Sequence, residues 1–307
     1  MTGYLTSFDG ERFRLPAAVE WSIRRTDGDP CDAFSVTFCA DAKQTAALHR
    51  AVRFDAEQDG KRLIVGVVDD FEMRQSERGS LVTVSGRGLA ALLMDNQVRS
   101  AEYQSAQLAD ILNTYVRPYG IGAIDAQSMG PVGAFTVETG YTCWQVLAGF
   151  CRHSANIFPR FGADGTLILR KGETGKRYGI RGGVLRAQYT EQRYGRVAKQ
   201  MLINTRNGSS TTAEDRDFLA IGGENVHVAG ITGHKIRAVW RNAAQRVEDA
   251  ARDARILELT LPGMQAMEPL DTVEVALAEM GVAGTFTVCS TEISMGPSGT
   301  QTVLEMR

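Results

Sequence analysis

Apolar and polar residues alternate along most of the first 97 residues, which is the pattern of half-buried β-strands. Two such runs, 19–23 and 34–38, flank Asp27-Gly28, a dipeptide that favours a tight hairpin turn. Similar short runs continue to Ser85, so the pattern predicts about six antiparallel strands. Short, evenly spaced strands favour a small barrel or sandwich, because closure removes exposed edges.

The pattern changes to a helical period after residue 97. Apolar residues at i, i+3 and i+4 predict a helix that ends at Tyr115, with Ser105 as its N-cap. A second helix is predicted after Thr142, a typical N-cap residue, and a compact hairpin is predicted around Ala163-Asp164-Gly165. Residues 98–177 are therefore expected to form a small α+β domain.

Short apolar runs and tight turns return from residue 178 to the end, interrupted by one helical pattern that starts near Asn242. The polar stretch Asn207–Asp215 has no periodicity and is expected to be irregular and mobile. We therefore predict a mainly β protein with three domains. Two small antiparallel β-barrels, residues 1–97 and 178–307, flank the α+β domain of residues 98–177.

Composition restricts the classes of function. The chain has 307 residues, 43% of them hydrophobic, with a formal net charge of −2 and a sequence pI of about 6.1. This length suits two or three domains. The near-neutral charge argues against a protein that holds nucleic acid on a basic surface. We expect no signal peptide and no membrane anchor, because neither pattern is visible in the sequence.

The stretch Leu81–Val98 reads as a strand, two glycines and a short helix, and two interpretations compete for it. Gly86–Ala91 satisfies G-x-G-x-x-A, the fingerprint of dinucleotide-binding turns, but the βαβ unit that the fingerprint requires is missing. The alternative is a structural corner, in which glycines break the strand and a leucine stripe packs the helix against its surroundings. We favour this corner, formed by Gly86, Arg87, Gly88, Leu89, Leu92 and Leu93.

Other candidate chemistry is weak. Asp69, Asp70 and Glu72 form an acidic group that could serve acid–base catalysis, but neighbours on a strand point to opposite faces. None of the four histidines has the spacing of a zinc site. A locally basic stretch with interleaved aromatics could stack on nucleic acid or face an acidic partner protein; its residues are Arg152, Arg160, Arg170, Lys171 and Lys176. The residues themselves therefore indicate no catalytic site, no cofactor and no metal.

Val84–Asn96 fits the pattern G-R-x-x-x-x-L-L-x-D-N. This stretch resembles phage tail baseplate hub proteins, a family that includes the hubs of Mu-like and T-even-like phages and related tail proteins of Gram-positive phages and prophages. Four later segments resemble the same family in the same order: Tyr141–Leu147, Phe161–Leu167, Leu261–Gly263 and Val288–Met306. One turn departs from the family pattern, because Pro269-Leu270-Asp271 replaces a glycine-aspartate pair.

The resemblance implies tail-tube-like barrels and a homotrimer whose two barrels per chain form a pseudo-hexameric ring. Such a ring joins the tail tube to the tip, and DNA passes through its channel without specific binding. The implied partners are a distal tail or tail tube protein, a tape measure protein, and tip, spike or fibre proteins. The implied location is the virion, with assembly in the cytoplasm of the host bacterium. The implied role is structural and not enzymatic; a tail-associated cell-wall hydrolase is the alternative.

Overall fold

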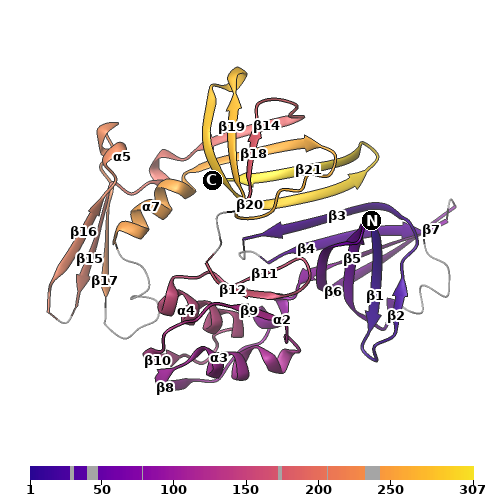
Figure 1. Cartoon of the computed structure of the whole chain (residues 1–307), viewed down its shortest axis with the longest axis horizontal. Coiled ribbons are helices and arrows are strands. Elements are labelled where there is room, and N and C mark those ends of the chain that lie inside the picture. Colours follow the sequence, from indigo (N-terminus) through magenta and orange to yellow (C-terminus); the bar gives the residue numbers. More distant parts are fainter. Residues whose placement is uncertain (28–30, 40–47, 78, 172–174, 206, 232–242) are drawn as a thin grey trace.

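The computed structural model describes residues 1–27, 31–39, 48–77, 79–171, 175–205, 207–231 and 243–307. Strands dominate these residues, so the predicted mainly β class is confirmed. Figure 1 shows two β modules above an α+β module, with a small lobe on the left.

The N-terminal module consists of β1 (Thr2–Ser7), β2 (Arg12–Arg14), β3 (Ala18–Thr26), β4 (Ala33–Cys39), β5 (Ala51–Gln58), β6 (Lys61–Ser76) and β7 (Gly79–Gly88). The C-terminal module consists of β13 (Arg177–Ile180), β14 (Arg186–Glu191), β18 (Arg255–Pro262), β19 (Thr272–Leu277), the short helix η3 (Ala278–Met280), β20 (Val282–Gly296) and β21 (Gly299–Met306). Each module encloses its own hydrophobic core.

One hydrogen-bonded path of strands runs through both β modules, in the order β14-β18-β21-β20-β3-β4-β7-β6-β5-β1-β2. The modules meet where Ser290–Met295 of β20 lies antiparallel to Trp21–Thr26 of β3. Ile293 and Met295 also pack against the core of the N-terminal module. A late strand of the chain therefore completes the first module. The closure of either module into a barrel remains a prediction.

The middle module carries α2 (Ala91–Met94), β8 (Ala101–Ala106), α3 (Leu108–Tyr115), η1 (Arg117–Tyr119), β9 (Ile124–Ala126), β10 (Val132–Val137), α4 (Cys143–Ala155), β11 (Arg160–Phe161) and β12 (Leu167–Leu169). Its core residues run from Ala90 to Leu169, with α3 and α4 packed together. The predicted domain limits at residues 97 and 177 remain predictions.

Helix α4 begins after Thr142, as predicted. The Thr142 hydroxyl accepts a hydrogen bond from the Gln145 amide (3.1 Å), and the Gln145 side chain accepts one from the Thr142 amide (2.9 Å). The predicted cap Ser105 is wrong, because Ser105 pairs with Gly133 in the β8–β10 ladder. Helix α3 starts after Gln107, whose amide donates to the Asp110 carboxylate (3.0 Å).

A small three-stranded sheet and two helices form the side lobe: η2 (Arg193–Gly195) leads into β15 (Lys199–Asn204), β16 (Ser210–Glu214), α5 (Arg216–Ala220), β17 (Val226–Ile231) and α7 (Ala243–Asp253). β15 lies between antiparallel β16 and parallel β17, and α7 packs on one face of the sheet. The prediction that Asn207–Asp215 is irregular is wrong, because Ser210–Glu214 is β16. The exposed side chains of β16 need not be apolar, so the strand lacks the alternation that would reveal it.

The helix predicted near Asn242 is present as α7, although Asn242 itself lies outside the described residues. No helix in the described part of the chain is long and apolar enough to cross a membrane.

Candidate functional site at the module junction

The predicted corner lies at the end of β7, but its glycines do not bend the chain. β7 continues through Gly88, paired with β4 on one side and β6 on the other. The prediction that Gly86 and Gly88 break the strand is therefore wrong. The chain turns at Leu89 and Ala90 and then enters α2.

Position 86 requires glycine because the backbone of β6 and an aromatic ring of the core both lie too close for a side chain. A Cβ atom at this position would lie 1.9 Å from the Val67 carbonyl oxygen and 2.7 Å from the ring of Phe34. A Cβ at Gly66, on the neighbouring strand, would lie 2.3 Å from the Arg87 carbonyl oxygen. The two glycines leave room for the Phe34 ring, which stacks on Phe54 with the ring centroids 4.1 Å apart.

Arg87 ties three elements together at the corner. Its guanidinium donates two hydrogen bonds to Asp69 of β6 (2.7 and 2.9 Å) and two to Asp95 at the end of α2 (3.0 and 2.7 Å). Asp69 can reach Arg87 because the β6–β7 register shifts between Val68 and Asp70, which leaves Asp69 as the extra residue of a bulge. The Arg87 guanidinium lowers the pKa of Asp95. The sequence showed both acids but not this arrangement, since bulges carry no simple sequence signal.

The helix after the corner belongs to the middle module. Leu93 is fully buried in that module's core, and Leu89 and Leu92 are half-buried against it. Arg87 therefore fixes the N-terminal sheet to an element that is anchored in the next core. The role of the six corner residues as a link between domains remains a prediction.

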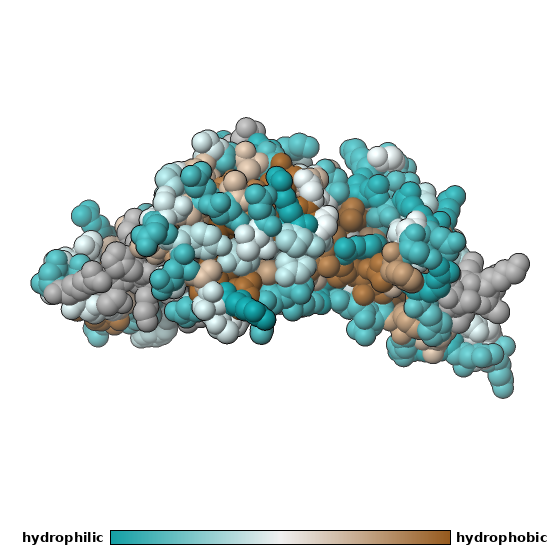
Figure 2. All heavy atoms as spheres, turned by 90° about the horizontal axis from the view of Figure 1, so that it is seen from below, coloured by the Kyte–Doolittle hydropathy of each residue, from teal (hydrophilic) through white to brown (hydrophobic). Residues whose placement is uncertain are grey.

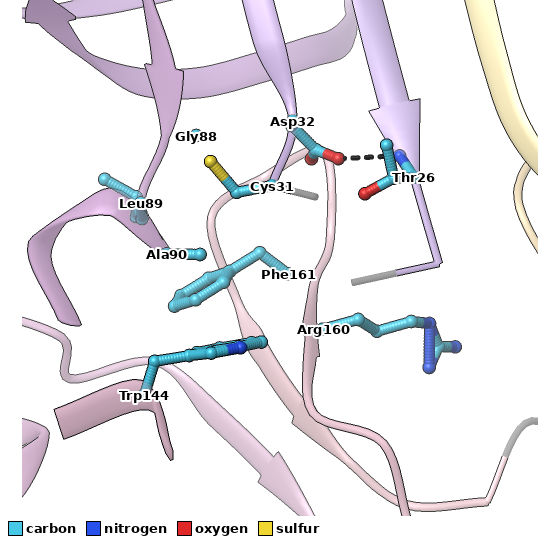
Figure 3. A pocket seen from close by; sticks show the side chains of 9 residues that line it. All are labelled: Thr26, Cys31, Asp32, Gly88, Leu89, Ala90, Trp144, Arg160 and Phe161. Atoms are coloured by element: carbon cyan, nitrogen blue, oxygen red, sulfur yellow. Dashed lines mark hydrogen bonds between the residues drawn. The ribbon is translucent and has the colours of Figure 1, made fainter. Parts of the chain in front are cut away.

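Figure 3 shows a narrow cavity where the corner meets the middle module. Its volume is about 10 Å³, which is about the space that one water needs. The lining residues are Thr26, Cys31, Asp32, Gly88, Leu89, Ala90, Trp144, Arg160 and Phe161. A dinucleotide does not fit this space, and β7 has antiparallel neighbours, so the structure offers no cradle at the G-x-G-x-x-A stretch.

Asp32 is the buried acid of this junction. Its carboxylate accepts a hydrogen bond from the Thr26 amide (2.8 Å), and its carbonyl accepts one from the Gly88 amide (2.7 Å). Burial raises the pKa of Asp32 to about 6, and the nearby Arg25 guanidinium only partly offsets this effect. Arg25 also pairs with Glu268 (2.5 Å), so the same cluster reaches the C-terminal module.

Asp32 should make the protein more stable as the pH falls from 7 to 4. Its pKa in the folded state, about 6, lies above the usual value of 3.8, so the folded protein binds this proton more tightly than the unfolded chain. The Asp32 contribution is fully present below pH 4 and is lost as the pH rises through 6. Chemical unfolding of the protein and of Asp32→Asn at several pH values measures it, and the difference between them should change by roughly 3 kcal/mol. Parallel pH curves would contradict this account.

Replacing Arg87 with leucine should cost about 1 kcal/mol of unfolding free energy, because a partly exposed network of two bidentate pairs is lost. Arg74→Leu is the matched control. Arg74 is exposed, and among the described residues its ion pair is with Glu72 on its own strand, so no measurable loss is expected. Urea unfolding compares the two variants, and an equal effect of both would show that the Arg87 network does not stabilise the corner.

The basic stretch of the middle module does not present a stacking platform. Phe150 and Phe161 are buried, and Trp144 stacks on Phe161 within the core (ring centroids 6.3 Å apart). Phe158 is exposed, but the Arg152 guanidinium already covers its ring (3.8 Å to the centroid). Among the described residues, no group of three His, Cys, Asp or Glu side chains could hold a metal ion.

Comparisons with known proteins agree with this architecture. Residues 90–171 match the family model of the second domain of gp44-like baseplate hub proteins. This is the segment that forms the core of the middle module. No curated protein sequence matches the chain.

The whole chain has the fold of solved phage tail proteins. A tail protein from Neisseria meningitidis MC58 is 16% identical, with a TM-score of 0.79 over 99% of this chain and 95% of that protein. The 43 kDa tail protein of prophage MuSo2 from Shewanella oneidensis is 17% identical, with a TM-score of 0.78 over 100% of this chain and 96% of that protein. The prophage tail protein gp18 from Listeria monocytogenes EGD-e is 10% identical, with a TM-score of 0.66 over 99% of this chain and 94% of that protein. The predicted resemblance to phage tail baseplate hub proteins is thereby confirmed.

Proposed function

We propose that this chain is a structural hub protein of a phage tail baseplate or a related injection particle. Three copies form a pseudo-hexameric ring that joins the tail tube to the tip, and DNA passes through its channel. The match of residues 90–171 to a baseplate hub domain and the tail-protein fold of the whole chain support this function.

The observation that carries the proposal is the polar face of the sheet that joins the two β modules. Four serines lie directly opposite one another across β20, β3, β4 and β7: Ser294, Ser22, Ser35 and Ser85. Beside them Thr37 and Thr83 share a hydrogen bond (2.9 Å). A groove of about 300 Å³ lies over part of this face. Small hydroxyl side chains across four strands suit a channel wall, because they offer little apolar surface and no charge.

The arginines of this face are already paired with acids. Arg24 lies 3.5 Å from Glu305, and Arg87 binds Asp69 and Asp95. Proteins hold DNA chiefly by neutralising its phosphates with free cationic groups. A face whose guanidiniums are neutralised supports passage of DNA without specific binding.

Exposed apolar side chains support assembly with partners. Val226 and Val228 of β17 are exposed and lie beside Lys199 and Met201 of β15, on the sheet face opposite the one that buries Leu202. Figure 2 shows a largely hydrophilic surface from below, interrupted by separate hydrophobic patches. Such patches are typical of surfaces that partners cover. We infer these partners to be a distal tail or tail tube protein, a tape measure protein, and tip, spike or fibre proteins.

Two measurements test the proposed function. Light scattering and cryo-microscopy should find a trimeric ring in solution or in particles that contain the protein. In such particles, Ser35→Lys combined with Ser294→Lys should leave assembly intact and reduce genome delivery, because the added amines hold DNA in the channel. Ser128→Lys is the control, since Ser128 is exposed on the middle module.

A protein that stays monomeric and is absent from particles would overturn the hub function. Normal delivery by the double lysine variant would overturn the assignment of the channel face alone. Lysis of cell walls by the purified protein would favour the hydrolase instead.

A further inference from the structure

We propose that the cleft between the C-terminal module and the side lobe binds an extended segment of a partner protein as an added strand of β20. The cleft has a volume of about 620 Å³, within the usual range of ligand sites. Residues 281–286 form one wall, and parts of α5 and α7 line the other side. The cleft shares no lining residue with the groove over the polar sheet face, and the inference does not depend on the proposed function.

The wall formed by β20 has a free edge. The N–H and C=O of Thr287 pair with the backbone of Arg307 (2.8 and 3.0 Å), so they point away from β19. Because backbone groups alternate sides along a strand, Thr285 and Ala283 present their N–H and C=O toward the same side. β21 ends at Met306, and within the described ranges no strand pairs with that edge of Ala283 or Thr285.

This free edge of β20 continues the hydrogen-bonded ladder that β20 forms with β21. β21 is the neighbour of β20 from Val288 onward, and Arg307 extends that pairing by one residue. β18 begins at Arg255 and β14 ends at Glu191, at the same end of the sheet. β20 and its neighbour β19 project further. The notch is the space beside Ala283 and Thr285 of β20, beyond the end of β21. An added strand would occupy this notch and would run in line with β21.

The side chains around the notch indicate the chemistry of the added segment. Phe286, Val282 and Tyr189 belong to the C-terminal core or pack against it, so they favour apolar residues on one face of the segment. Side chains of an added strand alternate between faces. The other face meets Arg307, which lies opposite Thr287.

Four arginines but only two carboxylates line the cleft: Arg196, Arg252, Arg255 and Arg307 against Glu191 and Asp217. Arg196 is bound to Asp215, and Arg252 to Asp249 and Asp253. Arg307 is paired with Glu305 (3.1 Å) and Asp253 (3.6 Å), although its Nε is buried without a hydrogen-bond partner among the described residues. Arg255, which also lines the cleft, forms no ion pair within the described part of the chain. We therefore infer a segment in which apolar and acidic residues alternate. Main-chain hydrogen bonds supply affinity in this mode of recognition, and the alternating side chains supply specificity.

Fluorescence anisotropy with two labelled hexapeptides tests the proposal. The acidic probe is Val-Glu repeated three times, with blocked ends, and the basic probe is Val-Lys repeated three times. The acidic probe should bind the full chain, and the basic probe should not. Arg255→Glu should weaken binding about tenfold, because it reverses a charge that lines the cleft. Arg14→Glu, on the distant strand β2, is the control and should leave binding unchanged.

Hydrogen exchange locates the segment on the unmodified protein. The acidic probe should slow amide exchange in residues 282–287, because strand addition protects the amides of Ala283 and Thr285. Ala283→Pro removes one of these donors, and proline is tolerated where a strand's N–H faces outward; this variant should lose binding. Failure of the acidic probe to bind, equal binding of both probes, or binding without protection of residues 282–287 would each overturn the proposal.

Discussion

Replacing Gly86 with alanine should destabilise the protein by about 3 kcal/mol or more. The new methyl group would lie 1.9 Å from the Val67 carbonyl oxygen, which belongs to the backbone of β6 and can move only with the sheet. It would also meet the Phe34 ring at 2.7 Å, in the middle of the N-terminal core. Relief of both contacts requires strands β6 and β7 to separate, and this loses ladder hydrogen bonds and core packing together.

Urea unfolding of Gly86→Ala measures this effect, and Gly179→Ala is its control. Gly179 also lies in a strand, β13, but a Cβ there meets nothing within 4 Å. That variant should be neutral or more stable by about 0.5 kcal/mol, because alanine restricts the unfolded chain. Equal effects at the two sites would show that close approach is not the reason for glycine at position 86.

Replacing Arg196 with methionine should cost about 3–5 kcal/mol, because it leaves a buried carboxylate without its cation. Arg196 donates to both oxygens of Asp215 (2.9 and 2.8 Å), and these side chains are only 6% and 7% exposed. Asp215 also caps α5 by accepting a hydrogen bond from the Phe218 amide (3.0 Å). The loss should therefore be concentrated in the side lobe, where hydrogen exchange and limited proteolysis can detect it.

A second substitution separates buried charge from lost packing. Arg196→Met combined with Asp215→Asn removes the charge and keeps a good capping residue, so most of the lost stability should return. Arg193→Met, at an exposed arginine three residues earlier, should have little effect. If the double variant is as unstable as Arg196→Met alone, the buried-charge explanation is wrong.

Local sequence patterns predicted the elements whose stabilising contacts are also local. The α4 cap could be predicted because Thr142 and Gln145 satisfy each other within one turn. The strands of the N-terminal module could be predicted because one face is buried and the other is polar, as at Trp21 and Ser22. The mainly β class followed from the same alternation.

Features that depend on distant partners could not be predicted from the pattern. Ser105 resembles a helix cap, but β10 pairs with it across the sheet. Gly86 resembles a turn residue, and only the positions of the Val67 carbonyl and the Phe34 ring reveal its role. The partnership of Arg87 with Asp69 depends on a bulge in β6. In each case a tertiary contact overrides a local preference, and a single sequence does not display that contact.

The pairing of β3 with β20 has a consequence for how the chain folds during synthesis. β3 ends at Thr26, whereas β20, the strand that pairs with it, begins only at Val282. During translation the edge of β3 stays uncovered until β20 has left the ribosome, because the two strands are far apart in the sequence. Contacts of such large sequence separation also slow folding. Shortened chains that lack β20 expose an unpaired strand edge, so they are expected to aggregate instead of accumulating as soluble subunits.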